Sequence, residues 1–201
     1  MKKEMLVKFN DPESIKECIK VLVGGGHLLG ADLTGADLTG AILKGAYLTG
    51  ANLRDAKLTS ADLTGAMLIH ADLKDAMIIR ANLSGADLGG ANLSSADLNQ
   101  ADFRGADLRR ADLTDAKLTG ANLRDASFYG ADLGDVNFGH ADLTGAKLQR
   151  ANLEGANLSG ANLKGAYFHA TDLEDADLTS VYLRRAKIST RQLVSELFIV
   201  E

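Results

Sequence analysis

The chain has 201 residues, of which 46% are apolar and 24% charged, with one proline, no tryptophan and a formal net charge of −5. This composition agrees with an ordered, soluble, single body, and no run approaches the roughly 20 apolar residues of a membrane span. The lone Cys18 excludes an internal disulfide, and the first residues lack the apolar core of a secretion signal, so we expect a cytoplasmic protein.

Residues 1–25 predict a cap that covers the N-terminal end of the following segment. Met5–Phe9 predicts a strand. Asp11 then predicts a helix N-cap, and Pro12 fits the first helical position. Apolar residues follow at helical spacing, and the glycines at 24–26 end the helix.

From residue 26 to residue 190 the sequence repeats every five residues. The central residue of each unit, at positions 28, 33, 38 and onward to 188, is Leu, Ile or Phe in all 33 units. Ala lies two residues earlier in all but four units, and Asp or Asn lies between the two in 21. On a helix each central residue would lie about 140° from the last, which leaves no apolar stripe to bury.

Strand geometry fits this pattern, because residues two apart point the same way. Ala31 and Leu33 are therefore expected to point inward and Asp32 outward, while Thr34 and Gly35 are turn-forming residues. A short strand followed by a bend, repeated every five residues, predicts stacked coils around one core of Ala and Leu.

Tandem units such as Ala31-Asp32-Leu33-Thr34-Gly35 resemble the A(D/N)LXX units of the pentapeptide-repeat proteins. The resemblance covers residues 26–190 and implies an all-β solenoid, a right-handed quadrilateral β-helix with four pentapeptides per coil. The four-sided form rests on the resemblance, since the period alone does not separate a square from a triangle. About eight coils at a strand spacing of about 4.8 Å predict a length of roughly 40 Å.

Residues 191–201 predict a helical cap or a dimerisation tail. Ser189 and Gln192 fit a capping box at the start of a short helix. The apolar residues after them are more numerous than a cap needs, and they suggest a two-fold homodimer. The candidate dimerisation residues are Leu193, Leu197, Phe198 and Ile199.

One face of the predicted square carries most of the negative charge. With four units per coil, residues twenty apart share a column, and the acidic face consists of residues 31–35 and the units at successive steps of twenty. Two cations oppose twelve acids there, a net charge of −10, against +3, 0 and +2 for the faces that begin at residues 26, 36 and 41. The acids are Asp32, Asp55, Asp72, Asp75, Asp112, Asp115, Asp132, Asp135, Glu154, Asp172, Glu174 and Asp175.

This charge distribution is compatible with two functions of different classes. The first is a non-catalytic rigid scaffold that presents a flat charged surface to an unidentified protein partner. The alternative follows from the resemblance, because some family members mimic duplex DNA and bind DNA gyrase or another type II topoisomerase. Twelve acids over roughly 40 Å give about one per 3.3 Å, near the ~3.4 Å spacing of one DNA strand and far from the ~1.7 Å of both.

Three observations favour the scaffold. Asp and Asn recur between the inward residues on most faces, which indicates a structural role for short hydrogen-bonding side chains. Asn52, Asn92 and Asn152 interrupt the acidic column, and no inserted loop interrupts the repeat.

A second candidate contact surface is apolar. Tyr47, Met67 and Ile69 fall on the face that begins at residue 26, in neighbouring coils. The later part of that face adds aromatic residues and five cations against Asp87 and Asp107, too few to predict direct nucleic-acid binding.

No catalytic, cofactor or metal site is predicted. The four histidines have no His or Cys partner in the same column, and flat columns of acids diverge rather than converge on an ion. A core packed with Leu leaves no pocket. We therefore expect that the protein is not an enzyme.

Overall fold

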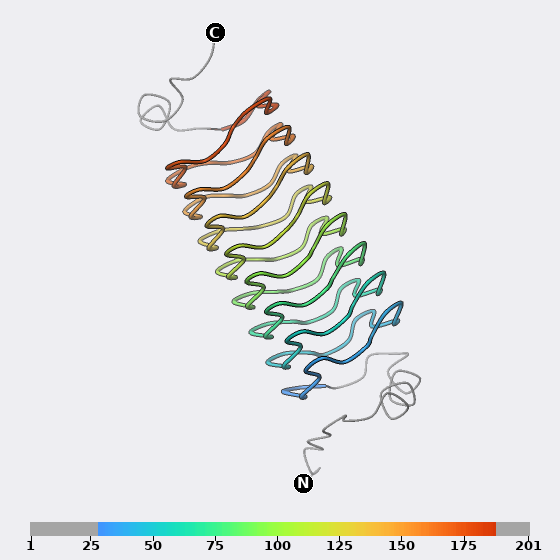
Figure 1. Ribbon diagram of the computed structural model, residues 1–201. Coiled ribbons are helices and arrows are strands. Elements are labelled where there is room, and N and C mark those ends of the chain that lie inside the picture. Colours follow the sequence, from blue (N-terminus) through green and yellow to red (C-terminus); the bar gives the residue numbers. More distant parts are fainter. Residues whose placement is uncertain (1–27, 188–201) are drawn as a thin grey trace.

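The computed structural model of the chain describes residues 28–187, and there the backbone winds into a stack of similar coils (Figure 1). Within these residues no helix and no continuous strand occurs; each unit contributes one isolated bridging residue and a two-residue turn. The predicted caps at 1–25 and 191–201 lie outside the described residues, as do Leu193, Leu197, Phe198 and Ile199.

The coils are four-sided. Each bridge is parallel and joins a residue to the one twenty positions later, from Asp32 with Asn52 to Tyr167 with Lys187. A unit of five residues and a coil of twenty give four units per coil, which confirms the four-pentapeptide coil that the resemblance implied.

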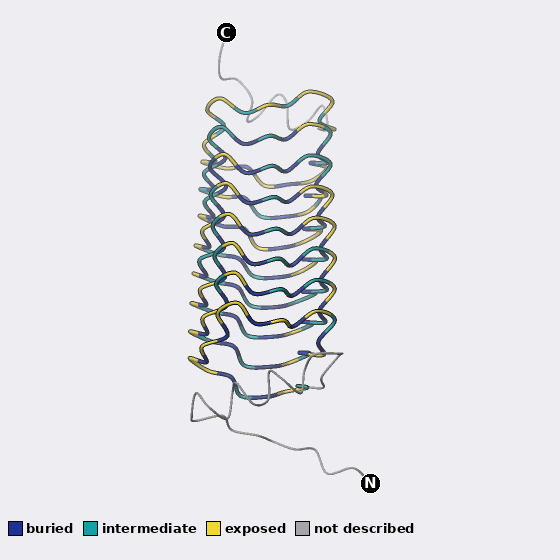
Figure 2. Ribbon diagram, turned by 90° about the vertical axis from the view of Figure 1, so that its right-hand side faces the viewer, coloured by how far each residue is buried: buried dark blue, intermediate teal, exposed yellow. Residues whose placement is uncertain are grey.

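The core is built from the inward pair of each unit. The central residues from Leu33 to Leu173 are at most 5% exposed, and the residues two positions earlier, from Ala31 to Thr171, are at most 6% exposed. Figure 2 shows buried and more exposed positions alternating along every side. The inward assignment of Ala and Leu is confirmed.

Larger core residues fit without a break in the coil register. Phe128 and Phe138 point inward from opposite faces of one coil, and their rings meet edge to face with centroids 6.0 Å apart. Thr171 takes the place of an Ala, and its buried hydroxyl donates to the carbonyl of Leu148 at 2.8 Å.

Every corner of the coil carries the same turn. In the unit 111–115, the amide of Ala116 donates to the carbonyl of Leu113 at 2.9 Å, and Asp115 has a φ of 60°. Every fifth residue from 30 to 185 has such a positive φ, as the third residue of a type II turn requires, and 17 of these corner residues are not glycine. Because a left-handed residue other than glycine costs roughly 1–2 kcal/mol, stacking of the coils must hold the corners in place.

Truncation of one inward leucine should therefore be costly. We expect Leu113→Ala to lower the free energy of unfolding by roughly 2–5 kcal/mol, because the fully buried side chain would leave a cavity. The control is Leu29→Ala, since Leu29 is 62% exposed. Denaturant unfolding followed by circular dichroism measures both, and a loss below about 1 kcal/mol for Leu113→Ala would contradict the packing.

Candidate interaction surfaces

In units with Asp or Asn at the bridging position, this side chain completes the hydrogen bonding of the backbone. In the unit 111–115, one amide closes a turn and three bond to neighbouring coils. The remaining amide, that of Thr114, donates to Oδ1 of Asp112 at 3.0 Å, and the Thr114 hydroxyl donates to the same oxygen at 2.7 Å. The outward carboxylate is therefore part of the turn.

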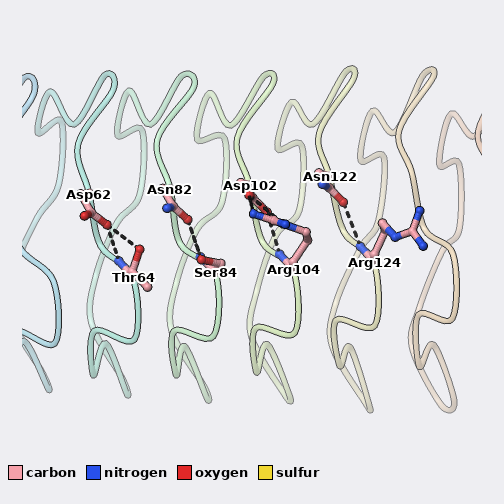
Figure 3. Close-up of polar contacts among 8 residues, drawn as sticks. All are labelled: Asp62, Thr64, Asn82, Ser84, Asp102, Arg104, Asn122 and Arg124. Carbon is pink, nitrogen blue, oxygen red and sulfur yellow. Dashed lines mark hydrogen bonds and ion pairs between the residues drawn. The ribbon is translucent and has the colours of Figure 1, made fainter.

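The same bond recurs in successive coils, and Figure 3 shows it on the face opposite the acidic face. The amides of Thr64, Ser84, Arg104 and Arg124 donate to Asp62, Asn82, Asp102 and Asn122 at 3.0, 3.0, 3.0 and 3.4 Å. Asn serves as well as Asp, because only an acceptor oxygen is needed. The structural role predicted for this position is confirmed, although the sequence did not indicate which amide is bonded.

The twelve acids of the acidic face divide by position. Seven lie outside the bridging position and bond to no turn amide in the described structure: Asp55, Asp75, Asp115, Asp135 and Asp175 at corners, and Glu154 and Glu174 just before corners. The other five accept turn amides at 3.0–3.2 Å: Asp32, Asp72, Asp112, Asp132 and Asp172. The corners do not require Asp, since Ser60, Arg80 and His140 take the same backbone conformation elsewhere.

The negative charge is concentrated in the C-terminal half of the acidic face. In the units from 31 to 95 four acids accompany Arg54 and Lys74, and Arg54 pairs with Asp72 at 3.3 Å. In the units from 111 to 175 the face carries eight acids and no Lys or Arg, a net charge of −8. Seven of these eight are exposed, and Asp112 is half-buried. A charge total for the whole face conceals this asymmetry.

The predicted apolar patch is assembled but only partly exposed. Tyr47 bridges to Met67 in the next coil, and the carbonyl of Ile69 accepts the amide of Gly50 at 2.8 Å. Tyr47 is 37% exposed, whereas Met67 and Ile69 are half-buried. The three residues are neighbours with a small accessible area.

A basic-aromatic stripe occupies the later part of the same face. Its members are Arg109, Arg110, Tyr129, Lys147, Arg150, Tyr167 and Lys187. The Arg150 guanidinium lies over the Tyr129 ring, 5.7 Å from its centroid, and the Lys187 ammonium lies 4.5 Å from the centroid of Tyr167. The sequence indicates these residue types but not the pairs, which join side chains about twenty positions apart.

One acid lies within the stripe. Asp107 pairs with Arg109 at 2.5 Å. The side-chain hydrogen bond from Arg109 holds the pKa of Asp107 below its usual value against the opposing effect of burial, and the charge of Lys147 lowers it further. The surroundings of this carboxylate are thus dominated by cations.

A shallow open hollow includes the N-terminal members of the stripe. It is lined by Ile69, His70, Asp87, Gly89, Gly90, Arg109, Arg110 and Tyr129. Residues 28–187 contain no group of three His, Cys, Asp or Glu side chains placed to hold a metal ion. The same stretch contains no helix long and apolar enough to cross a membrane.

The repeat geometry agrees with a comparison to known families. A model of the pentapeptide repeats matches in eight copies, over residues 24–55, 56–94, 86–125, 121–160 and 161–189. The chain belongs to the pentapeptide-repeat family. Its four-sided coil is the right-handed quadrilateral β-helix of these proteins.

Solved structures of pentapeptide-repeat proteins resemble the chain. HetL of the cyanobacterium Nostoc sp. strain PCC 7120, which is involved in the regulation of heterocyst differentiation, is 29% identical, with a TM-score of 0.50 over 90% of this chain and 95% of its own. A protein of the Arabidopsis thaliana thylakoid lumen is 35% identical, with a TM-score of 0.47 over 54% of this chain and 72% of its own.

QnrB1, a plasmid-mediated fluoroquinolone resistance protein, in a trypsin-treated form, is 22% identical, with a TM-score of 0.40 over 89% of this chain and 100% of its own. A search of curated proteins found no match.

The turn role and the charge of an acidic-face residue can be separated at Asp112. We expect Asp112→Asn to leave the free energy of unfolding within about 0.5 kcal/mol, and Asp112→Ala to lower it by roughly 1 kcal/mol, because only Ala removes the acceptor for the Thr114 amide. Denaturant unfolding measures both variants. Equal losses would show that the carboxylate acts through its charge.

Proposed function

We propose that this pentapeptide-repeat protein is a rigid, non-catalytic scaffold whose acidic face binds a protein partner. The proposal rests on the seven exposed acids in the C-terminal half of that face, which no Lys or Arg of the face opposes. Surface charge of one sign steers an oppositely charged partner and raises its association rate. The partner surface is therefore basic, and the single cysteine fits a reducing compartment such as the cytoplasm.

The packing supports a scaffold rather than an enzyme. The inward positions of every side are filled from Leu33 to Leu173, almost all of them by Ala, Leu and Phe, and the backbone amides bond from coil to coil. Such a body offers flat surfaces and little internal freedom. The likeness to HetL, a protein involved in regulation, is compatible with this role and supplies no activity to transfer.

A comparison of binding by two charge-matched variants tests the proposal. The first variant changes Asp112, Asp115, Asp132 and Asp135 to Asn, and the control changes Asp37, Asp62, Asp97 and Asp142, which lie on two other faces, to Asn. Proteins retained by the immobilised wild type at moderate salt should be lost from the first variant and kept by the control.

Equal retention by all three proteins would contradict a role for the acidic face. Circular dichroism of the three free proteins should be the same, since Asn retains the turn hydrogen bond where it replaces a bridging Asp.

The alternative partner is a type II topoisomerase bound in place of DNA. The observation that favours it is the charge density of the C-terminal half of the acidic face, where eight acids over four coils give about one charge per 2.4 Å, between the ~3.4 Å of one DNA strand and the ~1.7 Å of both. Against it, duplex DNA is negative all round, whereas the adjoining face carries five cations.

A supercoiling assay with DNA gyrase decides between the two functions. We expect no change in its supercoiling of plasmid DNA at micromolar protein, because the adjoining cations oppose docking into a site shaped for DNA. Inhibition by the wild type that disappears in the variant of Asp112, Asp115, Asp132 and Asp135 would instead establish the mimic.

A further inference from the structure

The basic-aromatic stripe and the acidic half-face lie on adjoining sides of the same coils. Between residues 106 and 187 the face of the stripe carries five cations and one acid, Asp107, a net charge of +4. The next face carries −8 over the units from 111 to 175. This half of the rod is therefore positive on one side and negative on the side next to it.

The cations of the stripe are available to an external partner. Within residues 28–187, Arg110, Lys147 and Arg150 form no ion pair. Arg150 lies over Tyr129 and Lys187 over Tyr167, which orders these cations without neutralising them. Guanidinium and ammonium groups without a carboxylate partner bind carboxylates, so the stripe suits an acidic protein surface.

We propose that the basic-aromatic stripe binds the acidic half-face of a second copy of this chain. The two surfaces have opposite charge, and both repeat once in each twenty-residue coil. When two parallel chains lie side by side without an axial shift, their rows of side chains are in register.

The contact joins two different surfaces of the chain, so it is heterologous, and its repetition produces a ring or an open row of copies.

The inference rests on the same acidic face as the proposed function but concerns the protein without its partner. In the assembly the acidic half-face of one chain is covered by the stripe of another. A basic partner then competes with the second copy, and binding of the partner dissociates the assembly. A monomer that still retains a partner through its acidic face keeps the proposed function and overturns this inference.

Light scattering after size-exclusion chromatography, applied to variants with reversed charges, tests the contact. One variant carries Arg110→Glu and Arg150→Glu, and the other carries Glu154→Lys and Glu174→Lys. The control, on the side opposite the acidic face, carries Lys164→Glu and Arg184→Glu, an equal change in charge at exposed positions. None of these six side chains takes part in a turn hydrogen bond in the described structure.

At about 0.1 M NaCl the wild type and the control should show a mass above that of the monomer, and each exchange variant alone should be monomeric. A mixture of the two exchange variants should recover the larger species, because each altered face then meets its opposite. About 1 M NaCl should dissociate the wild type, since the screening length falls from about 10 Å to about 3 Å.

A wild type that stays monomeric at about 0.1 M NaCl overturns the proposal. Association that both exchange variants retain, or a mixture of the two that stays monomeric, also overturns it.

Discussion

The fold depends on the hydrogen bonds that the backbone amides of a five-residue unit make, although the unit forms no continuous strand. Coil-to-coil bonds and the turn satisfy four amides, and in units with Asp or Asn the fifth bonds to an oxygen of that side chain. Asp and Asn have the right length to supply it. Much of the acidic character of the chain follows from this hydrogen bond, so the count of acids on a face overstates the charge placed there for binding.

The sequence predicted the parts of the structure that depend on the five-residue repeat. The spacing of Ala31 and Leu33 identifies the inward pair, because residues two apart share a side of the backbone whatever surrounds them. The square cross-section came only through the family resemblance. The turn bond to the Asp112 oxygen was not predicted, because a period does not reveal which amide lacks a backbone acceptor.

The surface was harder to predict than the core. Arg150 meets Tyr129 only because one coil is twenty residues long and the side chain at a corner reaches along the rod. The concentration of acids between residues 111 and 175 was present in the sequence, but a sum over the whole face hid it. On such a coil, the position of a residue along its column predicts the contacts of its side chain better than the number of charges on the face does.

The separation of charge between two adjoining faces has an energetic consequence. Neighbouring coils lie about 4.8 Å apart, where like charges repel by about 1 kcal/mol even in water. On the face opposite the acidic one, ion pairs such as Arg104 with Asp102 and Arg124 with Asp142 relieve this repulsion. The acidic half-face lacks such pairs, and its neighbouring cations lie around a corner. Stability of the isolated rod does not explain this arrangement, whereas a basic surface brought against the acidic half-face would relieve the repulsion.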